Sequence, residues 1–294
     1  MTTVPAPHTI DPKHNRAAAA RRRRQFHLAL LGLPAVILLL GLFVFPVFRL
    51  GILSLEGGNL IQYQKVVFDS LYMRILWDTL RISAIVTIIS LIMSYPVAYF
   101  MATTSRFWVI VGFTFVMLPF WTSILVRTYA WMVILGRNGV FNKTLLDLGL
   151  IEQPIAFLHN ELGVLIGMVH VLMPFMLLPI YSAMRQVDRS LVQAAQGLGA
   201  PAWKIMARVY LPLTVHGVVA GSLLVFVLSI GFFITPALLG GGRVLMISMI
   251  IEQQVREFVN WPFASALAFV LLAATLIIYV GVQRLTGGHS AVRR

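Results

Sequence analysis

The sequence contains no cysteine in its 294 residues. This absence excludes a disulfide framework and a thiolate metal site. The chain is also poor in charge, because Asp, Glu, Lys and Arg make up 11% of it, whereas a soluble domain carries roughly a quarter. Hydrophobic residues make up 59% and the mean hydropathy is +0.87, so most of the surface is expected to face lipid.

Six apolar runs are long enough to cross a bilayer, which takes about 20 residues. They are Leu28–Leu53, Leu76–Ala102, Phe107–Leu135, Gly163–Ala183, Val215–Leu239 and Pro262–Val282. The first run follows Arg21-Arg22-Arg23-Arg24, but it is too long for a signal peptide and no clear small-residue cleavage site follows it. We therefore expect an all-α membrane protein whose six transmembrane helices occupy residues 26–285. A basic, disordered tail at 1–25 and a short tail at 286–294 would flank them.

The distribution of basic residues predicts the orientation. If both termini are cytoplasmic, fourteen Lys and Arg residues fall on that side and six on the other, with three more in or at the edges of spans. This bias favours both ends inside. It also explains the net charge of +13 without nucleic acid, and the arginine run is suited to anionic lipid headgroups. A regulatory or partner-binding tail is the alternative role for that run.

The connection between the fourth and fifth spans, residues 184–212, is amphipathic rather than apolar. Asp188 is placed to cap a helix from Arg189 to Leu198, and Gly199 to end it in the left-handed conformation. Pro201 suits the first turn of a second helix, which Pro212 would end or kink. The apolar face of such a surface helix needs a cover, which is lipid, the protein's own bundle or a cytoplasmic partner.

The same loop carries a spaced motif. It reads Gln193-Ala194-Ala195, three residues, Gly199, nine residues, Val209-Tyr210-Leu211-Pro212. This pattern resembles the Glu-Ala-Ala…Gly…Ile-x-Leu-Pro signature of permease subunits of binding-protein-dependent ABC importers. The spacing agrees throughout, with Gln193 in place of Glu and Val209 in place of Ile. The first replacement removes a negative charge that would otherwise be available for an ion pair with the ATPase.

Further segments resemble the spermidine/putrescine-type branch of these permeases over residues 27–285. They are Leu118–Ser123 with Arg127–Trp131, Asn138–Asn142, Phe233–Gly241, and Ile251–Gln254 with Asn260–Pro262. The resemblance implies the type I permease fold and a bacterial inner-membrane location. It further implies two copies of a cytoplasmic ATP-binding subunit, a second permease that is a distinct paralogue, and a periplasmic solute-binding protein.

The resemblance implies a transporter subunit that moves a small amino-group-bearing solute, with a polyamine such as spermidine or putrescine as the first expectation. No phosphate-binding Gly-Lys-Ser/Thr motif is present, so ATP hydrolysis is expected in a separate subunit. No catalytic residue, cofactor or metal is expected. The residues assigned to coupling with the ATPase are Gln193, Ala194, Ala195, Gly199, Trp203, Leu211 and Pro212.

The candidate translocation-path residues lie in the third span and are Arg127, Trp121, Tyr129 and Trp131. A charge within a span should face the protein interior or extend to the interface. Arg127 therefore contacts cargo, forms an ion pair or snorkels outward, and the aromatic side chains form a wall for a cationic ligand or anchor the protein at the interface. His170, in the fourth span, is interpreted as a packing residue.

The alternatives are a stand-alone secondary transporter or channel, and an intramembrane hydrolase. The first predicts mid-membrane carboxylates and often an inverted repeat; the second needs a nucleophile paired with a base. The sequence shows neither pattern. Five prolines within spans indicate kinked helices, and the Gly217-xxx-Gly221 pair indicates close helix packing.

Overall fold

The computed structural model describes residues 33–34, 36–56 and 60–287, and every regular element within them is a helix. The tails expected at 1–25 and beyond 287, and the start of the first expected span, lie outside these residues. Five helices are long and apolar enough to cross a membrane, and one bent pair supplies a sixth crossing. The five are Val36–Ser54, α3 (Ser70–Thr103), α7 (Glu161–Arg185), the continuous helix Ala202–Ile230, and α13 (Trp261–Gly287).

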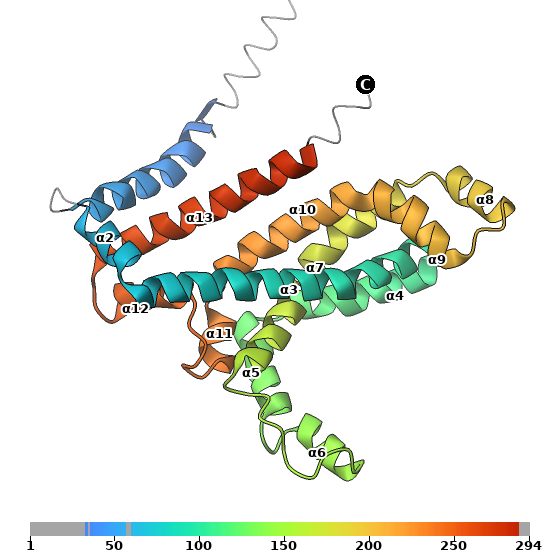
Figure 1. The fold of residues 1–294 in the computed structure, drawn as a ribbon, viewed down its shortest axis with the longest axis horizontal. Helices are drawn as coiled ribbons and strands as arrows, with labels where there is room; N and C mark the ends of the chain where they lie inside the picture. Colours follow the sequence, from blue (N-terminus) through green and yellow to red (C-terminus); the bar gives the residue numbers. More distant parts are fainter. Residues whose placement is uncertain (1–32, 35, 57–59, 288–294) are drawn as a thin grey trace, which may run out of the picture.

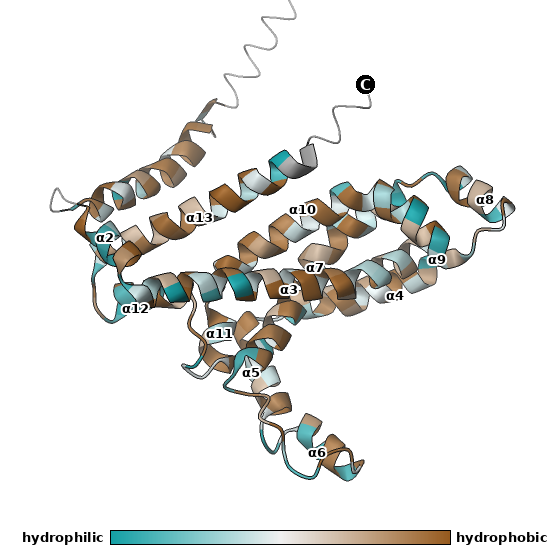
Figure 2. Ribbon diagram, in the orientation of Figure 1, coloured by the Kyte–Doolittle hydropathy of each residue, from teal (hydrophilic) through white to brown (hydrophobic). Residues whose placement is uncertain are grey.

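The crossings alternate in direction along the long axis of the molecule (Figure 1). Short helices connect them at the two ends. At one end lie α2 (Ile61–Phe68), α11 (Ile234–Leu239) and α12 (Ile247–Arg256), whereas α6 (Val140–Asp147) follows α5 and extends away from the long helices. At the other end lies α8 (Arg189–Gly197), which projects beyond the spans. Hydrophobic residues dominate the long helices, whereas hydrophilic ones gather at these connections (Figure 2).

The third crossing is broken, where the sequence predicts a single helix over Phe107–Leu135. It consists of α4 (Arg106–Met117), a 3₁₀ turn η1 (Leu118–Trp121) and α5 (Ile124–Leu135), and the pair is bent by 102°. Pro119 is the cause, because proline has no N–H to continue the helix and its ring crowds the preceding turn. After the break, the Pro119 carbonyl accepts both the Thr122 hydroxyl at 2.7 Å and the Thr122 N–H at 3.1 Å, which stabilises the turn.

The fifth crossing is also placed differently from the expected Val215–Leu239. A single helix runs from Ala202 to Ile230 through α9 (Ala202–Ile205), the π-helical turn η2 (Met206–Tyr210) and α10 (Leu211–Ile230). Pro212 therefore does not end a separate surface helix. The π turn before it widens the backbone at the position where the proline ring would otherwise meet a carbonyl. The span stops at Gly231, and α11 forms a separate short helix.

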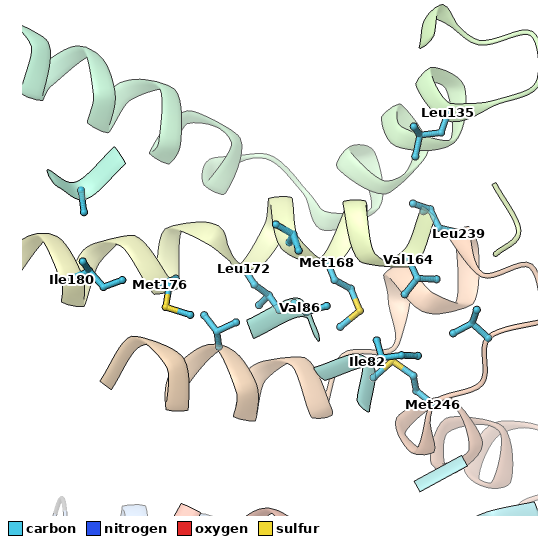
Figure 3. Packing of buried hydrophobic residues seen from close by; sticks show 14 of the residues in the cluster. Ile82, Val86, Leu135, Val164, Met168, Leu172, Met176, Ile180, Leu239 and Met246 are labelled. Atoms are coloured by element: carbon cyan, nitrogen blue, oxygen red, sulfur yellow. The ribbon is translucent and has the colours of Figure 1, made fainter. Parts of the chain in front are cut away.

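The core is built around α7, which packs against α3 and α10. In its apolar part 61% of the residues are buried, against none in the apolar part of Val36–Ser54, so α7 is the central helix and the first span lies at the periphery. Figure 3 shows Val164, Met168, Leu172, Met176 and Ile180 of α7 extending along one buried cluster. Ile82 and Val86 come from α3, Leu239 from α11 and Met246 from the segment before α12.

Small residues bring the central helices close together. A Cβ on Gly217 of α10 would lie 2.5 Å from the Cβ of Ala183 on α7, and a Cβ on Gly221 would lie 3.0 Å from the Met176 carbonyl oxygen. The predicted role of this glycine pair in close packing is confirmed. The side of α3 that packs against α7 and α10 carries small, buried hydroxyl residues at helical spacing. These residues also allow the helices to approach one another closely. They are Thr79, Ser83, Ser90 and Ser94.

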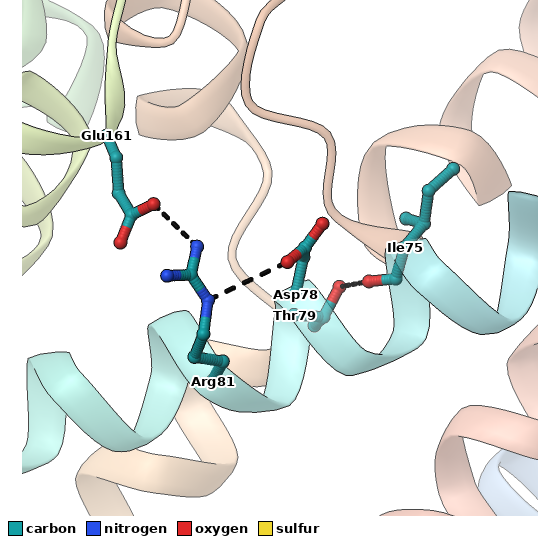
Figure 4. A network of polar contacts seen from close by, with 5 residues as sticks. All are labelled: Ile75, Asp78, Thr79, Arg81 and Glu161. Carbon is teal, nitrogen blue, oxygen red and sulfur yellow. Dashed lines mark hydrogen bonds and ion pairs between the residues drawn. The ribbon is translucent and has the colours of Figure 1, made fainter.

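A polar network fastens the end of α3 that is remote from α8 (Figure 4). The Arg81 guanidinium lies 2.6 Å from the Glu161 carboxylate at the start of α7 and 3.6 Å from the Asp78 carboxylate one turn away. The Thr79 hydroxyl donates to the Ile75 carbonyl and accepts the Ile247 N–H at 2.9 Å. The network therefore ties α3 to both α7 and α12.

Candidate functional site

Helix α8 begins with a side-chain cap. The Asp188 carboxylate accepts a hydrogen bond from the Ser190 N–H at 2.9 Å. This bond satisfies one of the backbone donors that the first turn of a helix leaves free. It also lowers the pKa of the Asp188 carboxyl, because the ionised form is the better acceptor. The predicted cap and the start of the helix at Arg189 are confirmed.

Gly199 ends the helix in the left-handed region with φ +73°. The Ala200 N–H donates to the Ala195 carbonyl at 3.0 Å and the Gly199 N–H to the Gln196 carbonyl at 2.9 Å. These two bonds close the helix in the manner of a Schellman motif. A Cβ on Gly199 would meet nothing within 4 Å, so glycine is required here by its backbone conformation and not by space.

Helix α8 has one face toward the bundle and one away from it. Val192 and Ala195, three residues apart, pack against the central hydrophobic cluster. Gln193 and Ala194 are exposed, and Leu198 at the tip is 88% exposed. A large apolar side chain held this far from the bundle is typical of a surface that another molecule covers.

The next turn continues this exposed surface. Trp203 is 67% exposed, and the Lys204 ammonium lies 5.6 Å from the centre of its ring. Leu211 and Pro212 are also exposed, but they lie in the first turn of α10, beyond the π turn, and not beside Gln193. The motif residues thus form two groups, with 193–203 at the projecting end and 211–212 on the span.

The projecting end is joined rigidly to the bundle. Ile205 and Tyr210 are buried, and the Tyr210 ring packs edge-on against Tyr99 of α3 with 5.0 Å between ring centres. One turn further on, the hydroxyls of Tyr95 and Thr214 lie 3.2 Å apart. These contacts anchor the helix that follows α8 to α3.

The candidate path residues on α5 separate into two faces. Arg127 and Trp131, four residues apart, share one face. The Trp131 indole N–H donates to Nδ1 of His170 on α7 at 3.1 Å, which supports the packing interpretation of that histidine. Tyr129, two residues from each, lies on the opposite side of the helix and is exposed. Trp121 lies in η1 and is 86% exposed. The three aromatic side chains therefore do not share one face of α5.

A cavity of about 230 Å³ opens at the end of the molecule where α11 and α12 lie. Phe233, Ala237, Leu245, Met249 and Ile250 supply its apolar lining, and Glu252, Gln253 and Glu257 its polar lining. The Glu252 carboxylate pairs with Arg256 at 3.0 Å, and Glu257 accepts a hydrogen bond from Gln253 at 3.0 Å. This arrangement presents negative charge at the rim of an apolar hollow.

Asn142 is a structural residue whose role the sequence does not reveal. It is fully buried in α6, its amide donates to the carbonyls of Gly136 and Ile155, and its side-chain oxygen accepts the Ile155 N–H at 2.9 Å. The asparagine thus fixes the long connection between α5 and α7. The signal in the sequence was limited to the segment Asn138–Asn142, which resembles the permease branch.

The same fold and motif recur in a described family. Residues 21–286 match the family model of the binding-protein-dependent transport system inner membrane component. The chain belongs to this family. The match covers all six crossings and the projecting loop, so it concerns the whole membrane body.

Several curated relatives are similar over most of the chain. The spermidine/putrescine transport system permease protein PotB of Haemophilus influenzae is 37% identical over 248 residues, covering 81% of this chain and 87% of the relative. PotB of Escherichia coli is 34% identical, covering 74% and 81%. The putative 2-aminoethylphosphonate transport system permease protein PhnU of Salmonella typhimurium is 26% identical, covering 88% and 92%.

A solved structure confirms the fold. A chain of the bacterial alginate ABC transporter, crystallised in complex with an alginate pentasaccharide-bound periplasmic protein, superposes with a TM-score of 0.75 at 18% identity. The superposition covers 90% of this chain and 95% of that one. At this identity the comparison shows the type I permease fold and no more.

The family membership establishes the class of function. The protein is a permease subunit of an ABC importer in the bacterial inner membrane, and a separate subunit hydrolyses ATP. The family also implies ATP-binding subunits, a second permease and a periplasmic binding protein. The assignment decides against a stand-alone secondary transporter or channel.

Proposed function

We propose that α8 and the Gly199 turn are the coupling element, and that they dock into a groove on the ATP-binding subunit. The observation that carries this proposal is the exposure of Leu198 on a helix capped at both ends and projecting from the bundle. Ala194 adds little bulk and lets the backbone approach the groove wall, and Gln193 offers a neutral hydrogen bond. The whole coupling loop spans residues 184–212.

Closure of two ATP-binding subunits would push α8, and the buried Ile205 and Tyr210 would pass this displacement to the spans. A lever of this kind requires a stiff link between the docking element and the moving helices. The contact of Tyr210 with Tyr99 supports such a link. Trp203 lies on the exposed side of the helix that follows α8. Leu211 and Pro212 form the turn where the π segment meets α10.

The end of the molecule that carries α8 faces the cytoplasm in this arrangement, and both termini lie on the same side. The charge bias of the loops supports this orientation. The alternating crossings agree with it, since the described start of Val36–Ser54 and the end of α13 point away from α2 and α12 (Figure 1). Residues 26–285 form the permease body, with basic tails at 1–25 and 286–294.

The complete transporter contains two ATP-binding subunits, this chain, a second permease that is a distinct paralogue, and a periplasmic binding protein. This chain forms half of the translocation path. Arg127 and Trp131 line or border that path on one face of α5, and Trp121 and Tyr129 extend from the broken crossing. Their position at a break in a span supports the assignment, because irregular backbone at membrane depth is tolerated where it lines a cavity or is buried in protein.

The transported solute is an amino-group-bearing compound, with a polyamine such as spermidine or putrescine as the first candidate. The names of the PotB relatives support this substrate class. The rim of the cavity at α12 also supports it, because the Glu257 carboxylate, which forms no ion pair among the described residues, attracts ammonium groups and Phe233 offers an aromatic face.

The test uses the complete transporter, extracted with a tag on this chain and reconstituted in proteoliposomes. Two ATP-binding subunits and a second permease should co-purify. Spermidine presented with the binding protein should raise ATP hydrolysis and drive ATP-dependent uptake, and 2-aminoethylphosphonate serves as the comparison solute. Purification of this chain alone, or uptake without ATP, contradicts the proposal. Stimulation by the phosphonate and not by spermidine contradicts only the substrate class.

A further inference from the structure

Arg127 is a charged side chain of α5 that has no counterion among the described residues. It lies in the second turn of α5, just after the break in the third crossing. Its Nε atom is enclosed by protein and has no hydrogen-bond partner. Within the described residues, the ion pairs are formed by Arg81 and Arg256, so Arg127 has no counterion there.

The position of Arg127 places its charge within the crossing. The N-terminus of α5 is the break inside the crossing, whereas its C-terminus leads to the loop at Gly136. Arg127 lies one turn after that break, where a charge facing lipid costs a few kcal/mol on insertion scales.

His170 of α7 gives Arg127 no hydrogen-bond acceptor. Nδ1 of His170 accepts the Trp131 indole N–H, and Trp131 shares a face of α5 with Arg127. A neutral histidine that accepts at Nδ1 carries its proton at Nε2 and is itself a donor there. Lipid chains supply no acceptor either.

The surface beside this cluster is uncovered and apolar. Trp121 is 86% exposed and Val126 is 62% exposed, on either side of the break. We propose that this face of the broken crossing packs against the second permease subunit, and that this subunit places a carboxylate against the Arg127 guanidinium. The inference rests on the two-permease assembly described above.

A permanent partner explains the observations better than the solute does. A buried charge that loses its partner is strongly destabilising. If only the solute paired with Arg127, the guanidinium would stand unpaired in every solute-free state of the transport cycle. A carboxylate on the second permease is present throughout the cycle, and it would also fix the register of the two subunits.

The first experiment measures how long the second permease stays bound in the detergent-extracted, complete transporter. Arg127→Gln should speed its dissociation by at least about tenfold, as expected for a buried charge pair that loses one member. Arg127→Lys keeps the charge and should have a smaller effect. Arg137→Gln, an exposed cation in the following loop, should leave the dissociation unchanged.

The second experiment identifies the partner. Arg127→Glu is combined in turn with an Asp→Arg or Glu→Arg change at each acidic residue within the spans of the second permease. One combination should restore retention. The absence of cysteine in this chain permits a parallel test, since Val126→Cys should cross-link to single cysteines in the second permease and Phe115→Cys, exposed on α4, should not.

The outcomes separate the possible partners. If Arg127→Gln leaves retention unchanged and instead alters the solute concentration for half-maximal uptake, Arg127 acts on the translocation path and not on the contact between the permeases, and the inference is overturned. If Arg127→Gln loses the second permease and none of the acidic-residue changes restores its retention, no carboxylate of that subunit pairs with Arg127. This outcome also overturns the inference. A wild-type extract without any second permease overturns the assembly itself, and the inference with it.

Discussion

Gly217 of α10 lies so close to α7 that an added Cβ would come within 2.7 Å of the Pro179 carbonyl oxygen. The oxygen belongs to the backbone and cannot rotate away. The helix that continues from the coupling element is thus held directly against the central helix of the bundle. In the proposed mechanism, this contact links the helix after α8 to the centre of the bundle.

Gly217→Val should destabilise the membrane body by about 1–3 kcal/mol, the usual cost of overpacking a tight contact. The measurement is the midpoint of thermal unfolding in detergent. Gly281→Val on α13 is the matched control, because a Cβ there meets nothing within 4 Å. Equal midpoints for the two variants would contradict the tight packing of α7 and α10.

Gly199→Val should abolish ATP-dependent uptake while the chain still inserts into the membrane. A β-branched residue resists the φ of +73° that closes α8. Gly199→Asn should retain much of the uptake, because asparagine tolerates the left-handed conformation. Uptake is measured in membrane vesicles alongside the amount of inserted protein. Unchanged uptake in the valine variant would exclude α8 as the lever.

Acid should loosen α8 through Asp188. Its pKa is lower in the folded state because the carboxylate accepts the Ser190 N–H. The cap therefore contributes fully above the ordinary pKa of 3.8 and is lost as the pH falls through the folded pKa, below that value. Hydrogen exchange of the α8 amides should accelerate in that range.

Asp188→Asn is the control for this pH dependence, because its amide oxygen still caps the helix but does not titrate. The α8 amides of this variant should exchange with the same protection above and below pH 3.8 once intrinsic rates are removed. If wild type and variant show the same acid response, another group controls it.

Asn142→Ala should loosen the loop between α5 and α7. It leaves the Ile155 N–H without its partner, at about 1–3 kcal/mol for a group that stays buried, whereas the Gly136 and Ile155 carbonyls each keep one backbone donor. Limited proteolysis should cut this loop faster than in wild type. Asn138→Ala changes an exposed asparagine four residues away and should have no effect. Equal cleavage of both variants would show that Asn142 does not hold the loop.

Local patterns predicted much of the coupling element correctly. The Asp188 cap, the helix from Arg189 and the left-handed Gly199 depend on neighbouring residues, and all three are present in the structure. The motif spacing likewise led to the right family. The limits of the third and fifth crossings were less predictable, because hydropathy alone does not show where a helix bends.

Long-range contacts explain the residue roles that the sequence did not predict. Asn142 had no structural role in the sequence analysis until the fold placed Ile155 beside it, and His170 acquired its role from Trp131 of another helix. Pro212 looked like a helix end, but the π turn before it allows one helix to continue into the span.

By itself the sequence determined the membrane location, the number of crossings, the turn chemistry of α8 and the family, since apolar run length, capping residues and motif spacing are local properties. Only the tertiary structure decided that the third crossing is broken, that the helix after the Gly199 turn runs unbroken into α10, and that Arg127 lacks a partner in the described chain. These features depend on which surfaces meet, and distant segments settle that by packing together.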